Sequence, residues 1–244
     1  MHIQQPIVLM LRILVCALCL VCVVQISAAS AQTAPCQIGV IPIAGDKFLI
    51  EKYGHFTFLD KLAHVGVVGW DLDELVVARV QAAAPGRTVR RVPFTREELF
   101  AARARARNPF MRDANFKAFI EETAAKVRCE RYVVVHRRGG FGREFGIGIS
   151  NYSDGKLVYL FAMTHIIVFD GRTFEVIKEG DANNDNGSRF ERALHNAVGG
   201  PYRRLTAAEF PARPADVSGN PVLREGVRAL LASSLDMTLP AMLK

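Results

Sequence analysis

The sequence predicts an α/β fold, a two-layer or three-layer mixed sheet with parallel strands first and an antiparallel hairpin extension after them. Short apolar runs alternate with capped helical segments over residues 36–136, a pattern typical of parallel strands joined by crossover helices. From residue 156 onward, apolar residues at alternate positions and an Asp170-Gly171 turn indicate a hairpin instead. The composition, 50% hydrophobic and 23% charged over 244 residues, excludes a disordered or collagen-like chain.

The parallel part of the fold is predicted from three strands and the helices between them. The expected strands 1, 2 and 3 are short apolar runs over 36–43, 88–92 and 131–136. Asp71 and Thr95 each precede a Glu by three residues, which is the capping-box pattern at the start of a helix. Pro85-Gly86 ends the first of these helices, and a third helix is expected from Asp113. This order predicts parallel strands 1-2-3 joined by right-handed crossovers.

The second half is predicted to extend the sheet with antiparallel strands. Residues 47–58 fit a hairpin around Gly54, and 145–149 fit a short strand. A long strand over 156–169 and a return strand over 174–178 flank the predicted turn. The last helix is expected over 220–237, with Asn220-Pro221 at its start and Pro240 closing it.

Residues 1–31 are predicted to be a secretory signal peptide. Arg12 precedes an apolar run over 13–26, and Ala29-Ser30-Ala31 fits the small-residue cleavage pattern. The alternative is a retained membrane anchor, but this run is shorter than the roughly 20 residues that span a bilayer. We therefore expect cleavage after Ala31, a single α/β domain over 32–244, and a periplasmic or secreted location.

Two cysteines remain after cleavage, Cys36 and Cys129. An even number of cysteines in an exported chain suggests a disulfide, and two free buried thiols are the alternative. Each cysteine precedes a predicted parallel strand. If strands 1 and 3 are parallel neighbours, the two Cα atoms can approach to the roughly 5.5 Å that a disulfide needs.

Positive charge is concentrated in one stretch of the chain. Residues 79–112 contain nine Arg and two Glu, whereas the mature chain as a whole has a net charge of +6 once Arg12 is removed. Such density attracts anionic partners, and we expect Arg103, Arg105 and Arg107 to contact one. Anionic lipid, lipopolysaccharide or an acidic protein surface fits an exported protein better than nucleic acid does. The alternative is a solvated arginine-rich helix.

Two motifs raise the question of a metal ion. Asp181–Gly187 has oxygen ligands spaced as in a calcium loop, but Arg192 stands where that loop needs a bidentate Glu. The spacing of His55, Asp60 and His64 matches no zinc motif. We expect no metal and no cofactor, with calcium at the Asp181–Gly187 loop left as an open alternative.

Other motifs also fit structure better than catalysis. The glycine-rich turn 139–142 opens no helix that could hold a phosphate, which favours a mobile hairpin tip. His165 lies in an apolar strand and fits a histidine of the sheet face. The sequence also lacks the Gly-x-Ser-x-Gly motif of serine hydrolases. We therefore assign no catalytic residue.

The first strand and the hairpin carry a resemblance to known proteins. Residues 38–42 read Ile-Gly-Val-Ile-Pro, and residues 167–177 read Ile-Val-Phe-Asp-Gly-Arg-Thr-Phe-Glu-Val-Ile. They resemble the small α/β domains of bacterial envelope assembly proteins: the amino-terminal domain of TolB, the curli-secretion and penicillin-binding-protein-activator lipoproteins, and uncharacterised exported proteobacterial proteins. The resemblance covers roughly residues 37–180, departs from the lipoproteins in lacking a lipidation cysteine, and transfers no functional residue. It implies a binding or assembly module.

The expected function is a non-enzymatic binding or assembly module of the bacterial envelope. Its expected partner is an envelope protein or anionic lipid, and it is peripheral to the membrane at most. The alternative is a periplasmic hydrolase at the carboxyl ends of strands 1 and 3, where open parallel sheets place ligands. Convergence of Asp46 and His136 in one pocket would favour the hydrolase.

Overall fold

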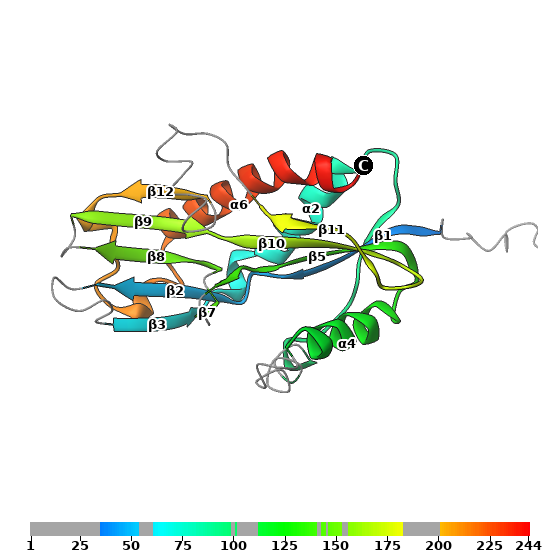
Figure 1. Ribbon diagram of the computed structural model, residues 1–244. Helices are drawn as coiled ribbons and strands as arrows, with labels where there is room; N and C mark the ends of the chain where they lie inside the picture. The colour runs from blue at the N-terminus through cyan, green and yellow to red at the C-terminus, as the bar shows by residue number, and fades with distance from the viewer. Residues whose placement is uncertain are drawn as a thin grey trace, which may run out of the picture. The chain divides into compact units, whose positions relative to one another are not determined.

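The chain forms two five-stranded mixed sheets with helices packed against them (Figure 1). The computed structural model describes residues 35–53, 61–98, 101, 112–140, 143–144, 146–152, 156–182 and 201–244. The predicted mixed α/β class is confirmed, but the strands build two sheets rather than one. The predicted signal peptide and its cleavage site lie outside the described residues. No described helix is long and apolar enough to cross a membrane.

Sheet A has the strand order β11-β10-β5-β1-β4. Its strands are β1 (Cys36–Ile43), β4 (Val89–Arg91), β5 (Cys129–Arg137), β10 (Thr164–Asp170) and β11 (Val176–Asp181). β1 runs parallel to both β4 and β5, and β10 runs antiparallel to β5 and to β11. The first strand of the chain therefore lies between the other two parallel strands, so the expected order 1-2-3 is not the order across the sheet.

Sheet B has the strand order β12-β9-β8-β2-β3. Its strands are β2 (Lys47–Lys52), β3 (Lys61–Gly66), β8 (Ile147–Tyr152), β9 (Leu157–Ala162) and β12 (Tyr202–Leu205). β2 and β8 are parallel, and every other pair is antiparallel. The hairpin predicted around Gly54 exists with its second strand at 61–66, and the expected strand residues 56–58 lie outside the described residues.

Three stretches of chain run from one sheet into the other. Residues 44–46 link β1 to β2, and Met163 alone separates β9 from β10 (Figure 1). β5 and β8, the central strands of the two sheets, are joined through a short hairpin of β6 (Gly139–Gly140) and β7 (Arg143–Glu144). Side chains keep alternating across Met163: Leu160 and Val168 belong to the main core, while Phe161 and Phe169 do not. The long strand predicted over 156–169 is thus one extended run divided between two sheets.

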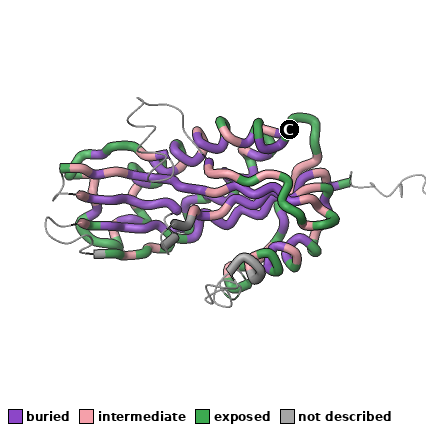
Figure 2. The backbone as a smooth tube through the Cα atoms, in the orientation of Figure 1, coloured by how far each residue is buried: buried purple, intermediate pink, exposed green. Residues whose placement is uncertain are grey.

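Helices pack on both faces of sheet A. α2 (Leu72–Ala83) and α6 (Pro221–Met242) lie on one face, and α4 (Arg112–Ala124) lies on the other (Figure 1). The single-turn helices are η2 (Val68–Trp70), η3 (Ala207–Glu209) and η4 (Pro214–Asp216). Buried residues follow the strands through the middle of both sheets (Figure 2). This part of the fold therefore has three layers, with sheet A between two layers of helices.

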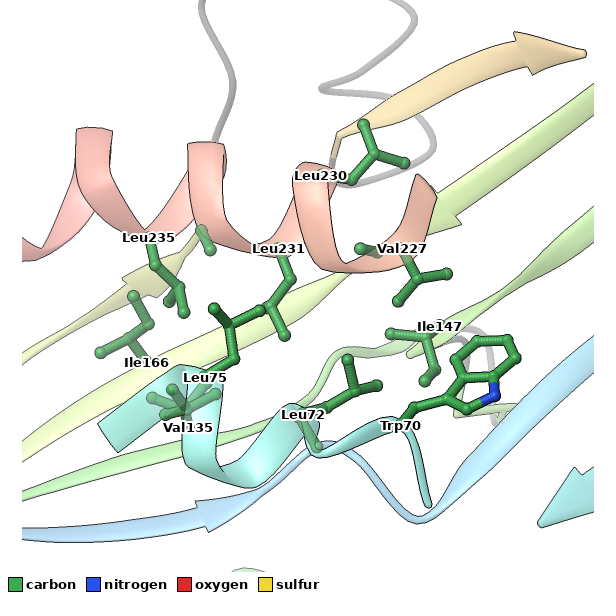
Figure 3. Packing of buried hydrophobic residues seen from close by; sticks show 14 of the residues in the cluster. Trp70, Leu72, Leu75, Val135, Ile147, Ile166, Val227, Leu230, Leu231 and Leu235 are labelled. Atoms are coloured by element: carbon green, nitrogen blue, oxygen red, sulfur yellow. The ribbon is translucent and has the colours of Figure 1, made fainter. Parts of the chain in front are cut away.

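The main core joins α2 and α6 to both sheets. Figure 3 shows Leu231 and Leu235 of α6 pointing toward Leu72 and Leu75, close to the side chains of the strands. Trp70 is 2% exposed and donates a hydrogen bond from Nε1 to the carbonyl of Ser218 at 2.9 Å. This satisfies the polar atom of a buried aromatic ring.

The predicted helix boundaries were partly right. At Thr95 the capping box is confirmed, because its backbone N–H donates to Glu98 and its hydroxyl accepts from the Glu98 N–H. The cap at Asn220 is also confirmed. The capping box at Asp71 is wrong: Asp71 has φ of 52°, and its side chain makes no capping bond. A capping side chain needs an extended backbone to reach the first turn.

α6 continues past Pro240 and ends at Met242, rather than stopping near 237. Leu239, Met242 and Leu243 are buried around this proline. Their packing outweighs the hydrogen bond that a proline removes from a helix.

The disulfide prediction is confirmed. Cys36 and Cys129 are bonded, with Cα atoms 4.5 Å apart and a sequence separation of 93. The two residues are also direct partners in the parallel β1–β5 register. Nearby, a Cβ on Gly171 would lie 2.0 Å from the carbonyl oxygen of Cys129, so only glycine allows the hairpin turn to approach this strand.

Candidate functional site

Asp46 and His136 do not share a pocket. Asp46 is 3% exposed and forms an ion pair with Arg137, whose Nη2 lies 3.3 Å from its Oδ1. Arg137 leaves β5 on the α2 side of sheet A, whereas His136 faces α4 and its ring lies 5.2 Å from that of Phe116. The two side chains on which the hydrolase alternative depended therefore lie on opposite faces of the sheet.

The carboxyl end of β1 is part of a buried ionic cluster. Asp73 is 7% exposed and pairs with Arg96 and, at 3.7 Å, with Arg91. Burial raises the pKa of Asp73, and the two guanidinium charges oppose that shift. Burying Asp46 and Asp73 together is costly unless cations accompany them, which explains why three arginines converge here. The cluster therefore has a structural role, in which it neutralises two buried carboxylates.

The arginine-rich stretch divides into two parts. Arg79 pairs with Asp236 at 3.1 Å, and Arg87 donates to the carbonyl of Leu243 at 3.2 Å. With Arg91 and Arg96 in the ionic cluster, at least four of the nine arginines bind to other parts of the fold. The candidate contact residues Arg103, Arg105 and Arg107 lie outside the described residues, so their role stays a prediction.

A cleft opens on the α4 side of sheet A. The antiparallel register places Ile167 of β10 opposite Glu179 of β11, and His165 opposite Asp181. His136, on the neighbouring β5, is directly opposite His165. The side chains of all three strands therefore form one wall, and Phe116 and Lys117 of α4 form the other. The cleft between them has a volume of about 510 Å³.

A polar chain borders this cleft. His165 Nδ1 lies 2.7 Å from an oxygen of Asp181, and the other Asp181 oxygen lies 3.0 Å from Arg138. His136 and His165 are edge-to-face, with ring centroids 5.2 Å apart. His165 is a sheet-face histidine with a partner, as the sequence indicates.

Neither metal motif receives support from the described residues. Asp181, the first residue of the calcium-like loop, is engaged by Arg138 and His165, and residues 183–187 lie outside the described part. His55 and Asp60 also lie outside it, and His64 is on β3. Within the described ranges, no three His, Cys, Asp or Glu side chains are grouped so that they could hold a metal ion.

The second face of sheet B is the feature that the sequence analysis missed. Tyr53, Tyr152, Tyr159 and Tyr202 form a row across four strands, with ring centroids 4.5, 6.3 and 5.1 Å apart. Glu51 is buried beside them and accepts a hydrogen bond from the Ser150 hydroxyl at 2.6 Å. The only sequence signal was Tyr159 in the alternating run, because the other three tyrosines come from separate segments. The cleft was equally hidden, since α4 and β11 are distant in sequence.

Comparison with known proteins gives distant likenesses only. No known family matches the chain, and no curated protein does. Among solved structures, the PelC dodecamer from Paraburkholderia phytofirmans matches at 10% identity over 86% of this chain and 93% of that chain, with a TM-score of 0.31. Protein XCC0632 from Xanthomonas campestris matches at 8% identity over 88% and 85%, with a TM-score of 0.36. The LpoB C-terminal domain from Salmonella enterica matches at 11% identity over 65% and 89%, with a TM-score of 0.24.

The predicted resemblance to bacterial envelope proteins is confirmed at this weak level of fold. A lipoprotein, GNA1162 from Neisseria meningitidis, is also among the similar structures, at 13% identity over 67% of this chain and 98% of that chain, with a TM-score of 0.31. Likenesses this distant transfer no partner, activity or assembly state to this chain.

Proposed function

We propose that the chain is an exported binding module of the bacterial envelope, without catalytic activity, that contacts an anionic partner through Arg103, Arg105 and Arg107. The disulfide between Cys36 and Cys129 supports export, because such bonds persist in oxidising compartments. A binding role is favoured over the hydrolase because Asp46 and His136 face opposite sides of the sheet.

The distribution of arginines is the observation that supports an anionic partner. Arg79, Arg87, Arg91 and Arg96 are already bound to acidic side chains or a carbonyl within the fold. Residues 99–112, by contrast, contain four Arg and no acid. In sequence, this second part of the stretch therefore carries a local excess of positive charge, and such an excess attracts anions.

The test is co-sedimentation with anionic phospholipid vesicles and with lipopolysaccharide. Arg103→Gln, Arg105→Gln and Arg107→Gln together should weaken binding at least tenfold. A matched control replaces three exposed arginines elsewhere, Arg172, Arg213 and Arg224, by Gln, removes the same charge and should change binding little. Binding should also collapse as salt rises, since the screening length falls from about 8 Å at physiological ionic strength to about 3 Å at 1 M.

Two results would reject this proposal. One is salt-insensitive binding, and the other is equal loss of binding in the two triple variants, which would show a response to net charge alone. An acidic protein partner would be indicated if the protein ignored both vesicles and lipopolysaccharide yet bound a soluble polyanion in an Arg103-dependent manner.

A further inference from the structure

The lining of the cleft between α4 and the outer strands of sheet A indicates what kind of ligand it could take. Its walls are largely aromatic and aliphatic, with rings from Phe116, Phe169 and Phe174. Its volume of about 510 Å³ is within the range of roughly 300–1,000 Å³ for small-molecule sites. Val176, at its rim, is 50% exposed, which is unusual for an aliphatic residue on a strand. The cleft is therefore suited to a ligand with an apolar body.

The charges at the cleft are negative although the protein is basic. Glu175 and Glu179 line it and are exposed, and neither carboxylate has an ion-pair or hydrogen-bond partner among the described residues. Lys117, the one fixed cation among the described residues of the lining, forms an ion pair with Glu121 at 3.7 Å. Two uncompensated carboxylates thus stand beside a set of aromatic rings.

Both imidazole groups at the cleft are engaged by other parts of the fold. His165 Nδ1 lies 2.7 Å from Asp181, which Arg138 also contacts, and His136 Nδ1 donates to the carbonyl oxygen of Arg137 at 2.9 Å. We therefore take the two glutamates, rather than the imidazoles, as the groups that would meet a charged ligand.

We propose that this cleft binds a small organic cation, an ammonium group carried on an apolar body. The faces of aromatic rings attract cations, and quaternary ammonium groups are recognised by cages of such rings. Glu175 and Glu179 would supply the opposite charge, and Ile167 and Val176 would contact the apolar part. The cation could come from a free amine or from a choline-type lipid head group, and the chemistry of recognition is the same.

The experiment is an NMR titration of the full exported chain with choline and with its neutral isostere 3,3-dimethyl-1-butanol. Choline should shift the amides of Phe116, Val176 and Glu179, and the neutral isostere should bind at least tenfold more weakly. Glu175→Gln with Glu179→Gln should weaken choline binding at least tenfold. Glu130→Gln, an exposed Glu on β5 outside this cleft, is the matched control and should leave the dissociation constant within about twofold.

A second set of measurements identifies the source of the cation. Flotation with phosphatidylcholine vesicles, competed by free choline, indicates a lipid head group, whereas choline binding without vesicle binding indicates a free amine. The proposal is overturned if the neutral isostere binds as tightly as choline, if the double Gln variant binds as the parent does, or if neither cation source binds. Because the glutamates are exposed and unpaired, thermal denaturation should show the variants to be folded.

Discussion

Sheets A and B share three stretches of chain but differ in what covers them. Sheet A lies between α2 and α6 on one side and α4 on the other, and Tyr132, Val133, Val134 and Val135 of β5 are all 2% exposed or less. In sheet B, α6 packs on one face, and none of the described helices packs on the other. Strands buried on both faces read as continuous apolar runs.

The uncovered face of sheet B uses a different residue type. Its row of partly buried tyrosines combines apolar rings with polar hydroxyl groups, which suits a surface that is only partly covered. Sheet A is thus packed on both faces, whereas sheet B has one packed face and one amphipathic face. Three predictions test this difference in packing.

The largest effect should come from the disulfide, which lies at the outer end of sheet A. Its loop of 93 residues corresponds to about 4.6 kcal/mol in the chain-entropy account. Replacing Cys36 and Cys129 by Ala should lower the free energy of unfolding by about that amount in urea denaturation. The unfolded, unreduced parent should show no titratable thiol. A loss below about 1 kcal/mol would mean that packing alone holds β1 against β5.

A matched pair of core substitutions compares the two sheets directly. Phe169 in sheet A and Phe161 in sheet B are 4% and 3% exposed and share one continuous strand run. Phe169→Ala should cost about 4 kcal/mol, because α4 and the sheet hold the cavity open. Phe161→Ala should cost about 2 kcal/mol, since Tyr202 packs beside it on the uncovered face and can move in. Equal losses in urea denaturation would show that both faces are packed alike.

The smallest effect is a pH dependence in sheet B. Burial, with the nearby charge of Glu51, raises the pKa of Tyr152. Because the pKa of Tyr152 is higher in the folded state, its contribution to stability is complete below the unfolded pKa of about 10. That contribution is lost as the pH rises through the folded pKa. Tyr152 should therefore ionise at a higher pH than a free tyrosine in a tyrosinate absorbance titration, and Tyr152→Phe should reduce the alkaline loss of stability. If Tyr152→Phe loses as much stability at alkaline pH as the parent does, Tyr152 is not the source of this pH dependence.

Sequence reasoning worked where neighbours along the chain decide the structure. The hairpin at Asp170 and the cap at Asn220 each follow from a local pattern. The Asp170 carboxylate accepts hydrogen bonds from the N–H groups of Arg172 and Thr173, as expected for that turn.

Features set by distant residues could not be predicted in this way. The alternation of apolar residues continues across Met163, where β9 ends and β10 begins. The sequence pattern therefore does not indicate that a second sheet starts there. Asp46 and Arg137 are 91 residues apart, and only the fold shows that they meet. Gly146 falls in the expected strand 145–149, but it has φ of +61°, and the side chain of Arg137 fills the space that a Cβ would need.

Three stretches of chain run through both sheets, and this affects how the protein unfolds. A strand that loosens in sheet B pulls directly on its continuation in sheet A, because only Met163 separates β9 from β10 and three residues separate β1 from β2. Partial unfolding that spares one sheet would therefore leave long strands half paired. The two sheets should melt together as one cooperative unit, with amide exchange in β8 and in β5 reporting the same opening free energy.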